Sequence, residues 1–157
     1  MPVRNSCATS RVSRGFLMLF ATALLFVSAV VLLSARKADA AMYAKENLIV
    51  LDKKELGGGK GVISGLYAFT RDKAAKEDAI KEITWLTIQP GDSVGFHQHT
   101  SNEDSYIIIS GTGVFKDTDG KEYPVKMGDV TIARRGDSHA LFNTGKDPLV
   151  FISVIAE

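Results

Sequence analysis

The sequence predicts an all-β domain that follows an apolar N-terminal segment. From residue 83 onward, short runs rich in β-branched and aromatic residues recur at close and even intervals. Turn signals separate these runs, among them Pro90-Gly91 and Asp119-Gly120. No long helical period occurs after the apolar segment. Short strands with glycine-containing turns are typical of an antiparallel sandwich or barrel.

The composition indicates one globular core and argues against nucleic-acid binding. A length of 157 residues suits a single domain, and the formal net charge is +1. The first forty residues carry Arg4, Arg11, Arg14, Arg36 and Lys37 against only Asp39, and the remainder of the chain is slightly acidic, so no basic stripe lies outside the first segment. The single cysteine, Cys7, is also in that segment. The rest of the chain therefore has neither disulfides nor thiolate ligands.

Residues 15–35 form an uncharged apolar run that follows several arginines and leads into Ala38-Asp39-Ala40. This order is the anatomy of a secretory signal peptide, with cleavage predicted after Ala40. The run also approaches the roughly 20 residues that span a bilayer as a helix, so a retained membrane anchor is the alternative. Both interpretations predict an exported domain. The chain then divides into a hydrophobic leader helix at 1–40, an N-terminal arm with the first strands at 41–82, and a barrel core at 83–157.

The arm contains a short apolar run at 48–51 and then Gly57-Gly58-Gly59-Lys60-Gly61, which predicts a flexible loop or a bend. A phosphate-binding loop is disfavoured, because the lysine is not followed by serine or threonine at the start of a helix. A strand is predicted at 62–69, and the charged, alanine-containing stretch 71–81 is predicted as an exposed loop or short helix. The remaining strands are predicted at 83–88, 94–99, 106–109, 113–116, 122–125, 130–133, 140–143 and 149–155.

The three histidines of the chain fall in two compact patches. His97 and His99 are two residues apart in a predicted strand, so their side chains point to the same face. His139 lies far along the chain. Together with the carboxylates Glu103 and Asp104, these imidazoles predict a metal site. Nitrogen and oxygen ligands with open positions suit one divalent transition metal, and Mn, Fe, Ni, Cu and Zn are all candidates.

The same residues carry a family resemblance. Gly91, His97-x-His99, an acidic residue and Gly111 resemble the first motif of the cupin superfamily; Gly128, Arg134-x-Gly136, His139 and Asn143 resemble the second. The resemblance covers about residues 83–155 and is to small single-domain (type 2) cupins. It implies a double-stranded β-helix, or jelly-roll, barrel with one metal ion, bound by two histidines and a glutamate of the first motif and a histidine of the second. It also implies a homodimer.

Two departures from the family pattern affect the predicted site. Unbroken strand alternation favours Asp104 as the acidic ligand, and this residue also keeps the family's spacing to Gly111. Residue type favours Glu103, which a β-bulge would bring inward, and we lean to Glu103 on that ground. The second departure is Arg134, which stands where the second motif usually has proline.

Three further residues are candidates for the pocket around the ion: Tyr106, Asn143 and Arg134. Arg134 belongs to a basic cluster that could attract a carboxylate at the rim, and a solvated surface position is the alternative. The resulting hypothesis is an exported cupin that acts on a small oxygen-rich or carboxylate molecule. If it is an enzyme, dioxygenase, decarboxylase and isomerase chemistries are all open. The alternatives are a non-catalytic module that binds a small ligand or metal, and an assembly protein that the metal only stabilises.

Overall fold

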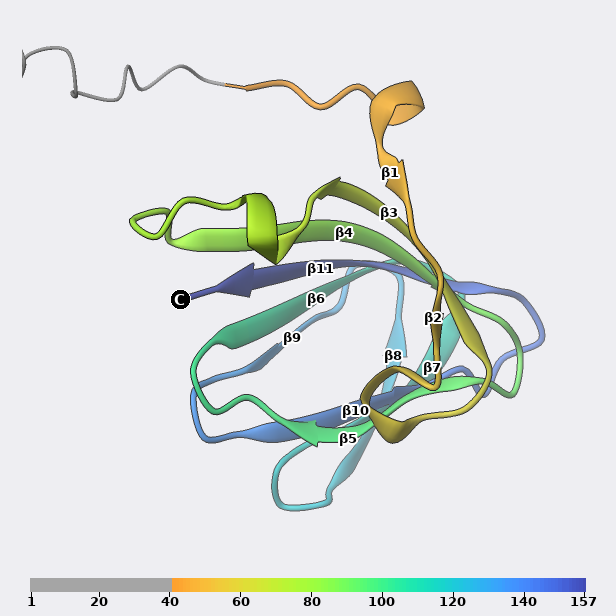
Figure 1. The fold of residues 1–157 in the computed structure, drawn as a ribbon. Helices are drawn as coiled ribbons and strands as arrows, with labels where there is room; N and C mark the ends of the chain where they lie inside the picture. Colours follow the sequence, from red (N-terminus) through yellow and green to blue (C-terminus); the bar gives the residue numbers. More distant parts are fainter. Residues whose placement is uncertain (1–40) are drawn as a thin grey trace, which may run out of the picture. The chain divides into compact units, whose positions relative to one another are not determined.

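The computed structural model describes residues 41–157, which fold into two antiparallel β-sheets (Figure 1). The larger sheet has seven strands in the order β1-β3-β4-β11-β6-β9, with β2 also paired to β3. These strands are β1 (Ile49–Val50), β2 (Lys53–Lys54), β3 (Val62–Phe69), β4 (Ile80–Ile88), β6 (Glu103–Ser110), β9 (Val130–Ala133) and β11 (Leu149–Ala156). The smaller sheet has the order β5-β10-β7-β8 and consists of β5 (Ser93–Gln98), β7 (Thr112–Lys116), β8 (Glu122–Lys126) and β10 (Ser138–Phe142).

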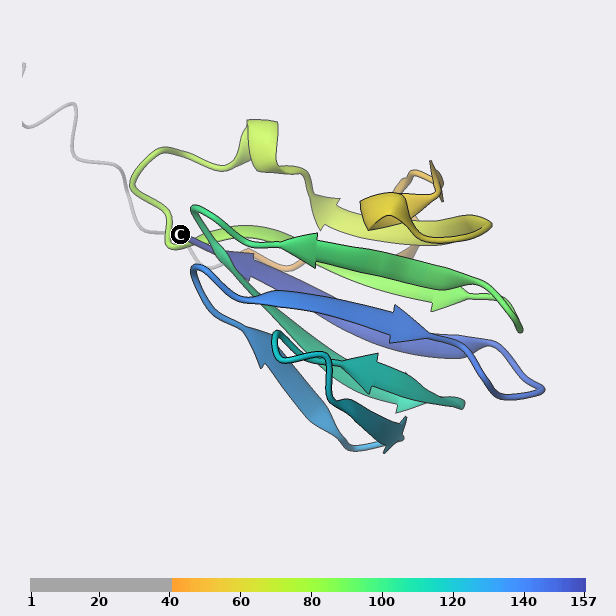
Figure 2. The ribbon, with the colours of Figure 1, turned by 90° about the horizontal axis from the view of Figure 1, so that it is seen from below.

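The two sheets are stacked, and Figure 2 shows the four-stranded sheet in front of the larger one when the molecule is seen from below. The chain passes repeatedly between the layers, since β4 and β6 belong to the larger sheet and β5, between them in sequence, to the smaller. This arrangement confirms the predicted all-β jelly-roll fold. The strands predicted from residue 83 onward are all present, and none of their ends shifts by more than three residues.

The helical elements of residues 41–157 are three short 3₁₀ turns: η1 (Lys45–Asn47), η2 (Leu56–Gly58) and η3 (Arg71–Lys73). The glycine sequence of the arm contributes η2, and the charged stretch after β3 begins with η3. The leader helix predicted at 1–40 lies outside the described residues. Within the part of the chain that is described, no helix has the length and apolar character needed to cross a bilayer.

The interior between the sheets is apolar at one end and polar at the other. In β11, the alternate residues Leu149, Phe151, Ser153 and Ile155 are buried, as expected for a strand with one face toward a core. The register places Leu149 opposite Ile88, and Ser153 opposite both Thr84 and Tyr106. The polar end therefore receives inward side chains from β4, β6 and β11, and it is the end where the histidines lie.

Candidate metal centre

The three histidines converge on one point inside the barrel. His97 and His139 are directly paired across β5 and β10, and His99 follows the end of β5. The Nε2 atom of His99 lies 3.0 Å from His97 Nε2 and 3.0 Å from His139 Nε2. The prediction that His97 and His99 share one face is thus confirmed, and the fold adds His139 from the neighbouring strand.

Hydrogen bonds fix the orientation of two of the rings. His97 Nδ1 lies 2.8 Å from the Gly95 carbonyl oxygen, and His99 Nδ1 lies 2.7 Å from Asn102 Oδ1. Both partners are oxygens that accept, so each Nδ1 carries the proton and donates it. The Nε2 lone pairs of both rings are therefore free to face the centre, which is the tautomer that a metal ligand requires.

His139 is held by packing instead. Its side chain is fully buried, stacks on Tyr106 with ring centroids 4.7 Å apart, and has the Phe115 ring edge-on at 5.8 Å. Burial, with the neighbouring His97 and His99, lowers the pKa of His139 to about 3. The ring is therefore neutral at neutral pH. Its Nδ1 atom has no hydrogen-bond partner among the described residues.

Asp104 brings the carboxylate from the opposite sheet. Its Oδ2 atom lies 3.8 Å from both His99 Nε2 and His139 Nε2, and its Oδ1 atom accepts a 2.8 Å hydrogen bond from Ser153 Oγ. Burial raises the pKa of Asp104 to about 6, although the Ser153 hydrogen bond and the electrostatic interaction with the nearby His97 ring oppose the rise. A carboxylate in this position is costly to ionise unless a cation lies beside it.

Glu103 lies on the other face of β6. Its carboxylate accepts a 3.2 Å hydrogen bond from the Arg134 guanidinium, on the outside of the barrel. The lean toward Glu103 from residue type therefore disagrees with the geometry, because β6 keeps an unbroken alternation here and turns Asp104 inward. No bulge interrupts the pairing of β6 with β9, and an inward Glu103 would need one.

The four inward residues fit a divalent ion. One donor atom from each of His97, His99, Asp104 and His139 lies within 4.8 Å of the others. Nε2 separations of 3.0 Å are close to the spacing of adjacent ligands that each stand about 2.1 Å from a common ion. Three imidazoles and one carboxylate form a nitrogen and oxygen set that suits first-row transition metals.

The three other predicted pocket residues lie in different places. Tyr106 lines the pocket beside Asp104 and His139. Asn143 is buried away from it, where its amide donates to the carbonyls of Ile88 and Asp147 and its Oδ1 accepts from the Gly145 amide, so it holds the turn before β11. Arg134 is exposed on the outside of the barrel and does not line the pocket.

The glycine-rich turn of the arm lies directly behind His97. A Cβ atom at Gly57 would stand 2.7 Å from His97 Nδ1, and one at Gly95 would stand 2.4 Å from the Gly57 carbonyl oxygen. Lys60 and Ser93 exchange backbone hydrogen bonds of 3.1 and 3.0 Å, which tie the turn to β5. The sequence indicated a loop or bend here, but nothing in it pointed to contact with a histidine 40 residues away.

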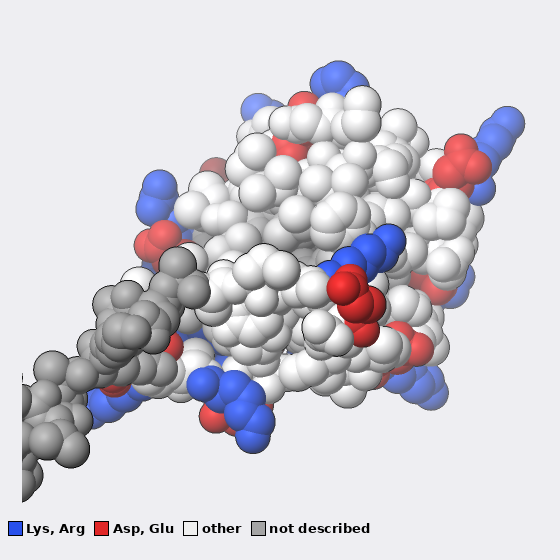
Figure 3. All heavy atoms as spheres, turned by 90° about the horizontal axis from the view of Figure 1, so that it is seen from above, with Lys and Arg blue, Asp and Glu red and all other residues white. Residues whose placement is uncertain are grey.

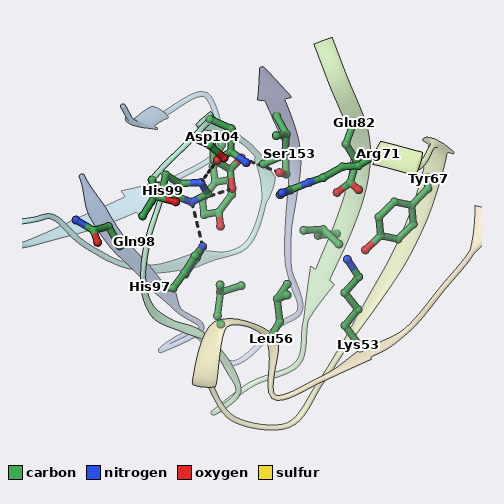
Figure 4. Close-up of a pocket in the computed structure, with 18 residues that line it drawn as sticks. Lys53, Leu56, Tyr67, Arg71, Glu82, His97, Gln98, His99, Asp104 and Ser153 are labelled. Carbon is green, nitrogen blue, oxygen red and sulfur yellow. Dashed lines mark hydrogen bonds and ion pairs between the residues drawn. The ribbon is translucent and has the colours of Figure 1, made fainter. Parts of the chain in front are cut away.

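His97, His99 and Asp104 line one side of a cavity of about 300 Å³, whereas His139 is fully buried and does not line it. Figure 4 shows that Lys53, Tyr67, Arg71 and Glu82 line the side away from the histidines. Sequence reasoning missed these four residues. All of them lie in the arm: Tyr67 belongs to the predicted strand 62–69, and Arg71 begins the charged stretch that is predicted as an exposed loop or short helix.

The fold and the cluster define a jelly-roll β-barrel with potential metal ligands inside it. In agreement, residues 84–155 match the model of the cupin domain family. The oxalate-binding protein of Thermotoga maritima is 39% identical over 98 residues, which are 62% of this chain and 78% of that protein. The chain therefore belongs to the cupin superfamily, as its two motifs indicated.

Solved structures agree with this assignment. The crystal structure of a predicted oxalate decarboxylase from Thermotoga maritima has a TM-score of 0.66 and 31% identity, and the match covers 74% of this chain and 98% of that one. The Cnp3 cupin domain of Schizosaccharomyces pombe is only 14% identical, with a TM-score of 0.57 and coverage of 75% and 74%. The second likeness shows the fold alone.

Proposed function

We propose that this chain is a metal-dependent cupin whose ion, bound by His97, His99, Asp104 and His139, receives a small carboxylate ligand. The observation that carries the proposal is the convergence of three Nε2 atoms beside one buried carboxylate. A bound divalent ion would supply a Lewis acid with open positions for ligand oxygens. The chain's own residues set the tautomers of His97 and His99, offset part of the ion's charge through Asp104, and pack Tyr106 and Phe115 against His139.

The names of the relatives support oxalate as the first ligand to try. One is called an oxalate-binding protein and another a predicted oxalate decarboxylase. Catalysis is the second candidate function, and Glu82 favours it, because it is the one carboxylate other than Asp104 that lines the described pocket. General acid or base catalysis needs a titratable group within reach of the substrate, and Glu82 faces the same cavity from the side away from the histidines.

Elemental analysis of the protein, purified without added metal, tests the proposal together with titration of the metal-free protein. We expect about one equivalent of a single divalent metal, as for a preformed four-ligand site, and oxalate binding only to the loaded protein. His97→Ala and His139→Ala should each lower the metal affinity at least about 100-fold, because even outer partners of metal ligands are worth about 10- to 100-fold.

Gln98→Ala is the matched control. This side chain lies between the two histidines in sequence but is exposed and donates to the Gly136 carbonyl, so its loss should leave metal affinity unchanged. Less than about a tenth of an equivalent of metal, with no rebinding of Mn, Fe, Ni, Cu or Zn, would contradict the proposal.

We also propose that the domain is exported, on the strength of the uncharged run at 15–35 and the small-residue site at Ala38-Asp39-Ala40. The mass of the protein recovered from its producing cells distinguishes the two forms of this proposal. A chain that begins at Ala41 indicates a cleaved signal peptide, whereas an intact Met1 end in the membrane fraction indicates an anchor. An intact chain in the cytosol would contradict export.

A further inference from the structure

The pocket has a second polar wall that family membership does not predict. Lys53, Tyr67, Arg71 and Glu82 form this wall, and all four precede residue 84, where the match to the cupin model begins. In Figure 4, the Arg71 side chain points across the cavity toward Asp104 and Ser153, and the side chains of Lys53 and Tyr67 face each other. The arm therefore places two cations in the cavity that also holds the histidine cluster.

Neither cation is held in a close ion pair, although Glu82 lies in the same wall. Among residues 41–157, no carboxylate lies within ion-pair distance of Arg71 or Lys53. The neighbouring acids are engaged elsewhere: Asp72 accepts from Thr70 Oγ1 and pairs with Lys73 at 3.3 Å, and Glu55 pairs with Lys54 at 3.8 Å. Lys53 Nζ lies 5.2 Å from the centre of the Tyr67 ring. Both side chains are thus available to an anion in the cavity.

Charge and volume together indicate the kind of anion. With a divalent ion in the cluster, the ion and two cations outweigh the carboxylates of Asp104 and Glu82 by two charges, so a dianion would balance the pocket. The cavity of about 300 Å³ holds the volume of about ten water molecules at ~30 Å³ each, which is more than a two-carbon diacid fills. The ligand that matches both properties is a diacid longer than oxalate.

We propose that Arg71, assisted by Lys53, binds the distal carboxylate of such a dicarboxylate while the first carboxylate binds the metal. The inference rests on the proposed function, since it requires the ion as the first anchor. A guanidinium can donate two parallel hydrogen bonds to a carboxylate, which makes Arg71 a selector of ligand length as well as charge. Figure 4 shows its tip facing the metal side of the cavity, as this role requires.

Calorimetric titration of the metal-loaded protein with oxalate, malonate, succinate and acetate tests the inference. We expect malonate or succinate to bind more tightly than both oxalate and acetate. Arg71→Gln should weaken binding of the best longer diacid at least about tenfold, as expected for loss of a charge-assisted hydrogen-bonded pair, and should change oxalate binding less than about threefold. The metal affinity of this variant should be unchanged. Arg134→Gln, an exposed arginine outside the pocket, should change none of these values.

The outcomes separate this inference from the function on which it rests. If the protein takes up no metal, both fail together. If metal and oxalate bind, but oxalate is preferred to every longer diacid or Arg71→Gln weakens oxalate and succinate equally, only the distal subsite is overturned. A loss of metal affinity in Arg71→Gln would also overturn it, because the effect would then lie in the metal cluster.

Discussion

At the scale of single residues, the site depends on which of two adjacent acids points inward. Asp104 is only 4% exposed and lies beside the histidines, whereas Glu103 pairs with Arg134 outside. Burial raises the pKa of Asp104 to about 6, so the charged form is held in an environment that disfavours it. A buried carboxylate of this kind lowers the stability of the metal-free protein. A cation bound beside it would offset this loss of stability.

Asp104→Asn tests whether the Asp104 carboxylate lowers the stability of the metal-free protein and is needed for metal binding. The substitution keeps the size of the side chain and an oxygen for the Ser153 hydrogen bond, but removes the charge. We expect the metal-free variant to have a Tm no lower than that of the wild type, because no buried carboxylate remains to be desolvated. Its metal affinity should fall at least about 100-fold, more than for loss of an outer partner, and the rise in Tm on adding metal should disappear.

Glu103→Gln is the control for this prediction. The exposed pair with Arg134 contributes only about 0–1 kcal/mol, so both Tm and metal affinity should stay close to the wild-type values. A metal affinity that falls in Glu103→Gln but persists in Asp104→Asn would show that the wrong acid has been assigned to the site.

The histidine cluster could be predicted because residue type and spacing within two short motifs identify its members. The choice between Glu103 and Asp104 could not be predicted in this way. The motifs fix His97, His99 and His139 by residue type and interval. The side on which Asp104 falls depends on one residue of register in β6, which the pairing with β9 and β11 decides. Residue type argued for the longer acid, and tertiary pairing overrode it.

At the scale of elements, the turn η2 acts as a support for β5. Gly57 and Gly58 both have positive φ, of 62° and 76°, but only a side chain at Gly57 would meet His97. A Cβ atom there would stand 2.7 Å from the Nδ1 atom that donates to the Gly95 carbonyl, whereas one at Gly58 would have no atom within 4 Å. An alanine at position 58 would therefore cause backbone strain alone, whereas an alanine at position 57 would cause the same strain and also displace His97.

Gly57→Ala and Gly58→Ala make this comparison directly. Both variants should lose about 1–2 kcal/mol of unfolding free energy, because alanine is disfavoured in the left-handed region. Only Gly57→Ala should also lower metal affinity, by about 10-fold or more, the lower end of the loss seen when a ligand's supporting contacts are removed. Chemical denaturation and metal titration measure the two effects independently. Equal metal affinities in the two variants would show that η2 does not position His97.

The strands themselves were predictable, but the pocket wall of the arm was not. Alternating apolar residues and glycine turns mark β4 to β11 in the sequence, because each strand has one face toward the core. Arg71 carries no such mark, since a charged residue after a strand is ordinarily solvated. Its position depends on the course of the connection between β3 and β4, which begins with η3.

At the scale of the whole molecule, the outer face of the larger sheet carries a continuous apolar row. Cross-strand pairing aligns Leu66, Trp85, Ile152, Ile107 and Val130 across five strands. Trp85 is 41% and Val130 65% exposed. Figure 3, which views the molecule from above this sheet, shows charged side chains mostly around the margin. Monomeric proteins seldom expose apolar surface of this continuity.

A second copy of the chain is the partner that best fits this face, because a row across a sheet can pack against itself about a twofold axis. We predict that the domain is a dimer by light scattering and that Trp85→Glu converts it to a monomer, since the change buries a charge at the centre of the interface. Tyr123→Glu, at a residue of similar exposure (38%) in β8 of the other sheet, should remain dimeric. Neither residue lines the metal pocket, so both variants should keep the wild-type metal affinity. A wild-type domain that is monomeric at micromolar concentration would refute the prediction, and the apolar row would then require a different partner.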